Sequence, residues 1–392
     1  MTTDDLLTRG VDQILPSKEV LDKLLKSGKK LRVYQGFDPS SPNLHIGHLI
    51  GLRKLRQWQE LGHEVIFLIG DFTGMIGDPT GKEEARPILS KETVENNAKT
   101  YKEQAEKILD FSGKNPVKIK FNSEWLEKLQ TPDVINLFSK VTYQQIIKRG
   151  MFKKRLENDG DISFNEVTYP ILQGYDSVAM DIDVEVGGRD QLFNMMIGRD
   201  LMHKMKHKNK FVITTLLLED SLGNKIGKTE GNAISFTDKP EQIYGAIMNF
   251  PDDTITKCLE CLTDISMDKI RNIEKEIKSQ KNPIEFKKLL AFEVVKQLHN
   301  QKEAKKAKEN FERTFQKGQT PSDVLEITVQ EGLDLIDFVA TQVESKSEAK
   351  RLIDQNAIEI DGQKNNNHKT LLKSGQVIKI GKKKFVKIIT EH

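Results

Sequence analysis

Two histidines stand three residues apart at the start of an amphipathic stretch. His45 and His48 lie in SPNLHIGHLIGLRKLRQWQ (Ser41 to Gln59). Zinc-binding histidine pairs on a helix are usually four residues apart with a glutamate between them, and no nearby cysteine or carboxylate completes a ligand set. A helix N-terminus binds anions through its N–H groups and dipole, and histidines at i and i+3 face the same side. We therefore favour a phosphate site, with a metal pair and a pair without function as the alternatives.

A second basic stretch lies about 180 residues further on. In EDSLGNKIGKTEGN, Lys225 and Lys228 flank Gly227 and are followed by Thr229. Lysines on a glycine-flanked loop can close on a polyphosphate as flexible point charges, although a solvated basic loop has the same composition.

A third basic pair follows an apolar run in GMIGDPTGKEEAR. Lys82 and Arg86 stand at i and i+4, so both can reach one pyrophosphate, or both can lie on a surface helix. The segment is not a Walker loop, because its glycine spacing is off by one and Glu83 replaces the Ser or Thr.

Strand and helix patterns alternate in the first half of the chain. Strand patterns cover residues 31–38, 64–72 and 117–122, and helix patterns cover 44–61 and 91–110. This order predicts an α/β fold with a doubly wound parallel (Rossmann-type) sheet and right-handed crossovers. Ligands bind such sheets at the carboxyl ends of the strands, where the histidine segment and the Lys82 segment begin.

From Pro240 the pattern becomes helical, with helices expected in 240–250, 268–280 and 284–315. Residues 316–323 form a polar linker. Beyond it we expect a short helix at 333–342, a helix from Ser345 to Asn356, and strands at 357–362 and 376–389, the last with a turn at 381–383. The predicted domains are therefore 1–235 (sheet), 236–320 (all-α) and 330–392 (small α+β).

Composition indicates a soluble globular protein, with 37% apolar and 30% charged residues. No apolar segment resembles a signal peptide or membrane span, so we expect a cytoplasmic protein. The two cysteines, Cys258 and Cys261, are read as structural. Residues 346–392 hold eleven Lys and Arg but five Asp and Glu, although the whole chain carries a net charge of only +3. This asymmetry favours a basic module that meets a polyanion, with a solvated tail as the alternative.

These motifs together resemble a known family. LHIGH and KIGKT are similar to the two signatures of class I aminoacyl-tRNA synthetases, the second as a variant of the K-M-S-K-S loop. YQGFDPSSPNLHIGH, GDPTGKEEARP, YPILQGYDS and VGGRDQLFN extend the resemblance to bacterial tyrosyl-tRNA synthetases over nearly the full length. SKSEAKRLIDQNAIEIDGQ resembles their C-terminal S4 RNA-binding fold.

The resemblance implies a two-step reaction. The carboxylate of L-tyrosine attacks the α-phosphorus of ATP, which gives tyrosyl-adenylate and pyrophosphate, and the tyrosyl group then moves to the 3′-terminal ribose of tRNA(Tyr). Mg²⁺ accompanies ATP, and no dedicated protein-bound metal is expected. Neither step needs a protein nucleophile, so catalysis must come from positioning and from donors aimed at phosphate charge. The residues expected in that role are His45, His48, Lys225, Lys228, Thr229, Lys82 and Arg86.

Substrate-binding residues are also implied by the resemblance. Tyr34 and Asp176 match positions that meet the phenol hydroxyl, and the tyrosine ammonium is assigned to Asp78, Tyr169 and Gln173, with Gln191 and Asn122 nearby. Tyr169, Gln173 and Asp176 also share one helical stripe by their spacing. The ATP-binding positions are Gly36, Asp38, Gly47, Gly188, Asp190, Leu217, Leu218 and Lys228.

For tRNA we expect contacts in the C-terminal module from Lys346, Lys350, Arg351, Lys382, Lys383 and Lys384, with the helical domain on the anticodon side. A homodimer interface is expected within residues 125–165, and no membrane partner. Three rivals stay open. A tryptophanyl-tRNA synthetase has no use for the Tyr34–Asp176 pair, a small-molecule nucleotidyltransferase needs no RNA-binding tail, and a non-catalytic RNA-binding relative needs no histidine and lysine motifs.

Overall fold

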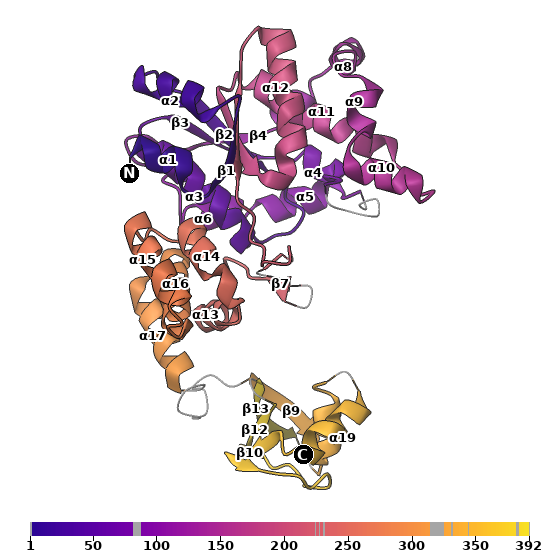
Figure 1. The fold of residues 1–392 in the computed structure, drawn as a ribbon. Helices are drawn as coiled ribbons and strands as arrows, with labels where there is room; N and C mark the ends of the chain where they lie inside the picture. Colours follow the sequence, from indigo (N-terminus) through magenta and orange to yellow (C-terminus); the bar gives the residue numbers. More distant parts are fainter. Residues whose placement is uncertain are drawn as a thin grey trace. The chain divides into compact units, whose positions relative to one another are not determined.

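The computed structural model describes residues 2–80, 88–223, 225–226, 228–229, 232–313, 325–330, 332–343, 345–381 and 384–391. The chain forms two compact units, Met1–Gln301 and Lys302–His392 (Figure 1). Among the described helices, none combines the length and the apolar character that crossing a bilayer requires.

A six-stranded sheet organises the first unit, in the order β1-β6-β5-β2-β3-β4. Its strands are β1 (Val11–Leu15), β2 (Arg32–Phe37), β3 (Glu64–Ile69), β4 (Lys118–Phe121), β5 (Val184–Gly188) and β6 (Phe211–Thr215). All neighbours are parallel except β1 and β6. The chain runs from β2 to β4 in one direction and returns with β5 and β6 on the other side of β2. The order therefore reverses between β2 and β5, which is where doubly wound sheets bind ligands. The predicted fold is confirmed, but the strands β1, β5 and β6 were not predicted.

Helix α3 (Ile46–Glu60) follows β2 and packs on β2, β3 and β5. Two cations in its second half bind the carbonyls of other segments. The Lys54 ammonium donates to Leu6 O, Arg9 O and Gln57 Oε1 at 2.6–2.9 Å. Arg53 donates to Asp264 Oδ1 at 2.7 Å, to Thr263 O and to Gln297. Both side chains are buried, so α3 is fixed at this end by charged hydrogen bonds.

Helices α11 (Phe164–Ala179) and α12 (Leu192–Lys206) lie side by side against the sheet, with α12 on β5 and β6. The remaining helices around the sheet are α1 (Thr3–Thr8), α2 (Lys18–Lys26), α4 (Thr73–Ile76), α5 (Lys91–Ala98), α6 (Tyr101–Ala105), α7 (Ser123–Leu126), α8 (Thr131–Phe138), α9 (Tyr143–Ile147) and α10 (Gly150–Glu157). The single helix predicted over 91–110 is wrong. The chain breaks between α5 and α6, where Thr100 and Gln104 donate to Pro42 O and so hold the segment before α3.

Four helices complete the first unit: α13 (Pro240–Met248), α14 (Ile255–Leu262), α15 (Met267–Lys278) and α16 (Ile284–Leu298). Cys258 and Cys261 are buried on α14, and burial raises the pKa of both thiols to about 12, which fits a structural role. The helix expected over 284–315 is interrupted. It ends at His299, whose Nε2 lies 3.0 Å from Asp238 O, and α17 (Gln301–Phe311) follows.

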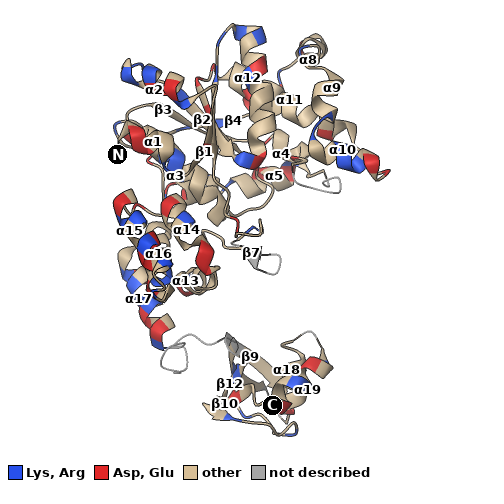
Figure 2. Cartoon of the chain, in the orientation of Figure 1, with Lys and Arg blue, Asp and Glu red and all other residues tan. Residues whose placement is uncertain are grey.

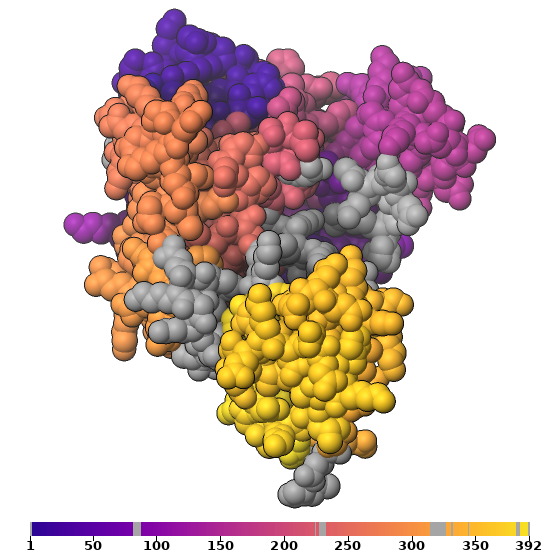
Figure 3. All heavy atoms as spheres, turned by 60° about the horizontal axis from the view of Figure 1, so that its bottom comes forward, coloured from indigo at the N-terminus to yellow at the C-terminus, as the bar shows by residue number. Residues whose placement is uncertain are grey.

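The second unit contains a five-stranded sheet in the order β11-β10-β12-β13-β9. Its strands are β9 (Leu325–Gln330), β10 (Ile358–Ile360), β11 (Gln363–Lys364), β12 (Val377–Ile380) and β13 (Lys384–Glu391), and its helices are α18 (Leu335–Ala340) and α19 (Lys346–Asp354). Buried side chains such as Phe338, Ile353 and Ile388 form one core, and the sheet with α18 and α19 makes one compact body (yellow in Figure 3). Strand β9 was not predicted, because it pairs with β13 about sixty residues later.

Candidate active site

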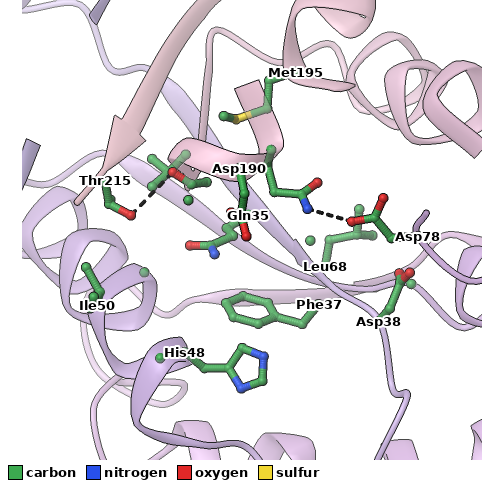
Figure 4. Close-up of a pocket in the computed structure, with 18 of the residues that line it drawn as sticks. Gln35, Phe37, Asp38, His48, Ile50, Leu68, Asp78, Asp190, Met195 and Thr215 are labelled. Carbon is green, nitrogen blue, oxygen red and sulfur yellow. Dashed lines mark hydrogen bonds between the residues drawn. The ribbon is translucent and has the colours of Figure 1, made fainter. Parts of the chain in front are cut away.

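A cavity of about 380 Å³ opens at the carboxyl ends of β2 and β5, the point where the strand order reverses. Most of the predicted site residues line it (Figure 4). They are Tyr34, Gly36, Asp38, His45, Gly47, His48, Asp78, Asn122, Tyr169, Gln173, Asp176, Gly188, Asp190, Gln191, Leu217, Leu218 and Lys225. Lys82 and Arg86 lie outside the described residues. Lys228 and Thr229 are described as backbone only, in the short strand β7 (Lys228–Thr229), which pairs with β8 (Asn232–Ala233).

Asp176 projects from α11 into the cavity and is held from both sides. Trp125 Nε1 donates to Asp176 Oδ1 at 2.9 Å, and Asn122 Nδ2 donates to Oδ2 at 3.3 Å. Burial raises the pKa of the Asp176 carboxyl well above its usual range, while these two hydrogen bonds favour the ionised form. Asn122, expected near the ammonium-binding residues, thus lies beside Asp176, and it also donates to Thr73 Oγ1 at 2.9 Å.

Tyr34 belongs to a buried polar network below Asp176. Its hydroxyl lies 3.0 Å from Ser177 Oγ, and the Lys210 ammonium donates to the same Ser177 Oγ at 2.9 Å. Lys210 also forms an ion pair with Glu185 of β5. Burial raises the pKa of Tyr34 well above its usual value, so its phenol keeps its proton at neutral pH.

Asp78 is the centre of a second hydrogen-bonded group. Gln191 Nε2 donates to Asp78 Oδ2 at 2.6 Å, and Thr80 Oγ1 donates to Oδ1 at 2.6 Å. Asn194 Nδ2 lies 2.8 Å from Gln173 Oε1 and 3.4 Å from Asp78 Oδ1. Carboxylate and amide oxygens gathered in this way suit an ammonium group, which has three donors and no acceptor.

Asp38 directly follows the end of β2 and accepts hydrogen bonds from two side chains. Tyr169 donates its hydroxyl to Asp38 Oδ2 at 2.7 Å, and Thr73 donates to Oδ1 at 2.8 Å. Burial raises the pKa of Tyr169 well above its usual value, so Tyr169 remains a donor. Asp38, predicted for ATP, thus lies between the two predicted binding regions.

The two histidines form the N-terminus of α3. Gly47 N donates to His45 Nδ1 at 3.1 Å, His45 N donates to His48 Nδ1 at 3.1 Å, and the rings stack with centroids 3.8 Å apart. Because a backbone N–H occupies Nδ1 of each ring, the neutral imidazoles carry their proton on Nε2. Each ring can therefore offer an Nε2–H donor to an anion at the helix N-terminus.

The segment after the lysine loop is fixed to the start of α3. Ile46 N donates to Ile234 O, and Phe236 N donates to Leu44 O, both at 2.9 Å. Within the loop, Ile226 N donates to Leu218 O at 2.8 Å, and the Lys225 ammonium lies 3.3 Å from Asp190 Oδ2. These backbone bonds bring Lys225 and the two histidines to one cavity.

Several residues of the site were not predicted: Trp125, Ser177, Glu185, Asn194 and Lys210. Glu185 and Lys210 did leave a signal, since each is a charge in or beside a strand that is otherwise uncharged and mostly buried. Two such charges on neighbouring parallel strands are expected to pair, because an unpaired buried charge is costly.

The predicted tRNA-binding residues of α19 are exposed. Lys346, Lys350 and Arg351 lie at the surface of the second unit, where Figure 2 shows basic positions on α19 and on the sheet. The Lys346 ammonium is 2.6 Å from Asp337, and Arg351 is 3.5 Å from Glu348. Lys382 and Lys383 lie outside the described residues, and Lys384 is described as backbone only, at the start of β13.

Comparison with known proteins places the chain in a family. A family model described as tRNA synthetases class I (W and Y) matches residues 26–316. The chain is 42% identical over 389 residues to a tyrosine–tRNA ligase of Thermotoga maritima, covering 98% of this chain and 96% of the relative. It is 43% identical over 386 residues to that of Haemophilus influenzae, covering 97% and 95%. Among solved structures, a C-terminally truncated mitochondrial tyrosyl-tRNA synthetase of Coccidioides posadasii matches with a TM-score of 0.64 at 24% identity, covering 78% of this chain and 90% of that one.

The chain therefore belongs to the class I tRNA synthetases of the tryptophan and tyrosine group. The resemblance predicted from the sequence is confirmed.

Proposed function

We propose that this chain activates L-tyrosine with ATP and transfers it to the 3′-terminal ribose of tRNA(Tyr). The observation that carries the proposal is the pairing of Tyr34 with Asp176 in one buried, polar part of the cavity. A phenol hydroxyl both donates and accepts, and this part of the cavity offers a carboxylate acceptor and a hydroxyl partner. An indole of tryptophan can donate but cannot accept, so it would leave the Tyr34 hydroxyl with no acceptor on the substrate.

The Asp78 group would hold the tyrosine ammonium, and the Nε2–H groups of His45 and His48 would meet the ATP phosphates with Lys225 and Lys228. None of these groups forms a covalent bond with substrate. They stabilise negative charge as it develops on the phosphates during attack by the carboxylate. Thr229, Lys82 and Arg86 are proposed to share this role.

ATP would lie along Gly36, Gly47, Gly188, Asp190, Leu217 and Leu218, and would bring Mg²⁺ with its phosphates. A flat base is proposed to lie against α3 at Gly47, which has no side chain. The same glycine leaves room for the His45 ring, since a Cβ there would come within 3.0–3.1 Å of that ring. Within the described part of the chain, no three His, Cys, Asp or Glu side chains gather as a metal site requires.

The tRNA is proposed to contact the exposed basic residues of α19 together with Lys382, Lys383 and Lys384, with residues 236–320 on the anticodon side. A homodimer is proposed through α8 to α10. Ile135, Tyr143 and Leu156 of these helices are 52–64% exposed, which is unusual for large apolar side chains and fits a surface that a second copy covers. Light scattering should give about twice the 44.7 kDa chain mass. A chain-sized mass for the fully active enzyme would contradict the dimer.

Amino-acid-dependent exchange of pyrophosphate into ATP tests the proposed function. Exchange should occur with tyrosine and be far slower with phenylalanine, because a site that hydrogen-bonds a hydroxyl rejects the analogue without it, a rule for which tyrosyl-tRNA synthetases are themselves the standard example. Equal or faster exchange with tryptophan would contradict the assignment.

A further inference from the structure

Four buried side chains from four elements form a polar chain beneath the proposed tyrosine site. Lys210 precedes β6, Glu185 is on β5, Ser177 is on α11 and Tyr34 is on β2, and none is more than 3% exposed. The Lys210 ammonium contacts Glu185 Oε2 and donates to Ser177 Oγ at 2.9 Å, and Ser177 Oγ lies 3.0 Å from Tyr34 Oη. Asp176, next to Ser177 on α11, lines the cavity above them.

We propose that Lys210 and Ser177 are positioning residues that fix the direction of this hydrogen-bond chain, so that Tyr34 presents its O–H as a donor to the substrate hydroxyl. The inference rests on the proposed function and deepens it, because it names what sets the polarity of the tyrosine site.

The direction follows from the donor capacity of each group. An ammonium can only donate, so Ser177 Oγ must accept from Lys210. The single hydrogen of Ser177 then points either to Tyr34 Oη at 3.0 Å or to Glu185 Oε2 at 3.4 Å. The second choice is weaker by distance, and that oxygen is already engaged by Lys210. Ser177 therefore donates to Tyr34. The hydrogen of Tyr34 then has two possible acceptors, the Glu185 carboxylate, which also forms a hydrogen bond with this phenol, and a group bound in the cavity.

A bound phenol selects the same direction. The substrate hydroxyl gives its hydrogen to the Asp176 carboxylate, so its oxygen requires a donor. If Tyr34 donated to Ser177, two oxygens would face each other without a hydrogen between them. In the proposed direction, Lys210 donates to Ser177, Ser177 to Tyr34, Tyr34 to the substrate hydroxyl, and the substrate hydroxyl to the Asp176 carboxylate. Each hydroxyl oxygen in this chain then accepts one hydrogen bond. Hydrogen bonds that align in one direction also strengthen one another.

The fold provides space for the ammonium. A Cβ on Gly198 of α12 would lie 2.6 Å from Lys210 Nζ, and a Cβ on Gly174 of α11 would lie 3.0 Å from Gly198 N. Glycines at both positions therefore let α11 and α12 approach while leaving room for Lys210. Burial lowers the pKa of Lys210, and the Glu185 carboxylate opposes this shift, so the pair keeps a donor at the start of the chain.

The test compares tyrosine with 4-aminophenylalanine in pyrophosphate exchange. The aryl amine can donate to Asp176, but its nitrogen is a poor acceptor, so a Tyr34 fixed as donor should disfavour it. In Ser177→Ala, Tyr34 is released to accept from the second amine hydrogen. The ratio of kcat/KM for tyrosine to that for 4-aminophenylalanine should fall about 10-fold or more, mainly through KM.

Two further variants keep the test decisive. The double variant Lys210→Met with Glu185→Gln removes both charges together, so it leaves no unpaired buried ion, and it should lower the ratio in the same way because Ser177 can then turn in either direction. Thr254→Ala is the matched control, since it removes another buried hydroxyl. The Thr254 hydroxyl donates to Pro251 O at 2.7 Å and does not line the cavity. This control should leave the ratio unchanged.

Equal losses for both amino acids in the Ser177 and Lys210 variants would show a merely structural role and overturn the inference, as would an unchanged ratio. Failure of the proposed function would appear differently, as absent tyrosine-dependent exchange in the unmodified chain, and would overturn both.

Discussion

The end of the cavity proposed to bind tyrosine (the tyrosine end) and the end proposed to bind ATP (the nucleotide end) are built in different ways. Around Asp176 and Tyr34, the polar side chains are buried and already hydrogen-bonded to other protein groups. At the nucleotide end, the Lys225 side chain is 54% exposed and contacts Asp190, and its loop is held by a few backbone bonds. The first end is complete before substrate arrives, whereas the second presents cations and N–H groups to a ligand that brings its own charge.

The two ends of the cavity suit two different tasks, discrimination between amino acids and stabilisation of phosphate charge. Discrimination between amino acids requires buried groups that are costly to leave unpaired, because the penalty for the wrong substrate comes from that cost. Stabilising charge on a phosphate requires donors that gain most as the charge grows during reaction. Changes at the two ends should therefore affect selectivity and rate separately.

The largest effect is expected from a truncation of the chain that leaves both ends of the cavity intact. Ending the chain after Thr320 removes most of the second unit but keeps the sheet, α13 to α16 and every residue assigned to tyrosine and ATP. Tyrosine-dependent exchange should persist, and charging of tRNA(Tyr) should be lost.

The salt dependence of tRNA binding gives an independent measurement. For the intact chain, log K should fall with log salt by about 0.7–0.9 for each phosphate neutralised, and the shortened chain should show a shallower slope. Unchanged charging with an unchanged slope would mean that the basic residues of α19 are only solvated surface.

The second largest effect is expected from a substitution at the tyrosine end of the cavity. Asp176→Ala leaves Trp125 Nε1, one hydrogen-bond direction of Asn122 and the substrate hydroxyl without their acceptor. At about 1–3 kcal/mol for each of these unpaired groups, kcat/KM for tyrosine should fall by roughly 10²-fold or more. Steady-state exchange measures this loss. Asp110→Ala, a carboxylate that accepts from Ser112 and Gly113 in an exposed turn, is the control and should keep full activity.

A smaller and kinetically different effect is expected at the nucleotide end. Truncating His45, His48, Lys225 or Lys228 to alanine should lower the rate of adenylate formation by about 10²–10³-fold, because each group meets charge that peaks in the transition state. Rapid-mixing measurements give this rate, and equilibrium binding gives the tyrosine Kd, which should stay nearly unchanged. A variant that binds tyrosine ten times more weakly while forming adenylate at the normal rate would contradict the division between the two ends.

The smallest expected effect is on the free energy of unfolding, and it comes from a residue outside both ends of the cavity. Burial lowers the pKa of Lys54 from 10.5 to about 7 in the folded chain. Between these two values the unfolded chain binds the extra proton, so folding stability should rise with pH, by at most about 1.4 kcal/mol per unit. Below pH 7 both states are protonated and the contribution is flat.

Urea unfolding from pH 6 to 9, compared between the natural chain and Lys54→Met, isolates this contribution. The stability difference between the two should increase above pH 7. A difference that is constant over the whole range would show that the Lys54 ammonium keeps its ordinary pKa.

The sequence predicted the central sheet because β2 and β3 are apolar runs followed by amphipathic helices, a pattern that local residues determine. It did not predict β5 or β6, for which no strand pattern was recognised. It also did not predict β1 or β9, which are edge strands whose partners lie far along the chain. The helix break before Tyr101 was also missed, because it depends on side chains that bind the backbone near Pro42.

The residues of the candidate site also fall into those that local sequence predicts and those that it does not. Residues in compact motifs, such as His45 and Lys225, could be found from type and spacing. Ser177, Glu185 and Lys210 could not be joined into one network from spacing, because the register of β5 against β6 brings them together.

Helix α3 carries the two histidines at its first turn, while Arg53 and Lys54 bind the α1 and α14 regions two turns later. A helix of this length behaves as a stiff rod, so the histidines cannot shift without moving the helical region that holds the other end. Because one helix carries both sets of contacts, a displacement of the α14 region is expected to move the proposed phosphate site together with α3. The fold thus gives the reacting centre a mechanical link to a surface well removed from it, and lengthening or shortening that rod by one residue should uncouple the two.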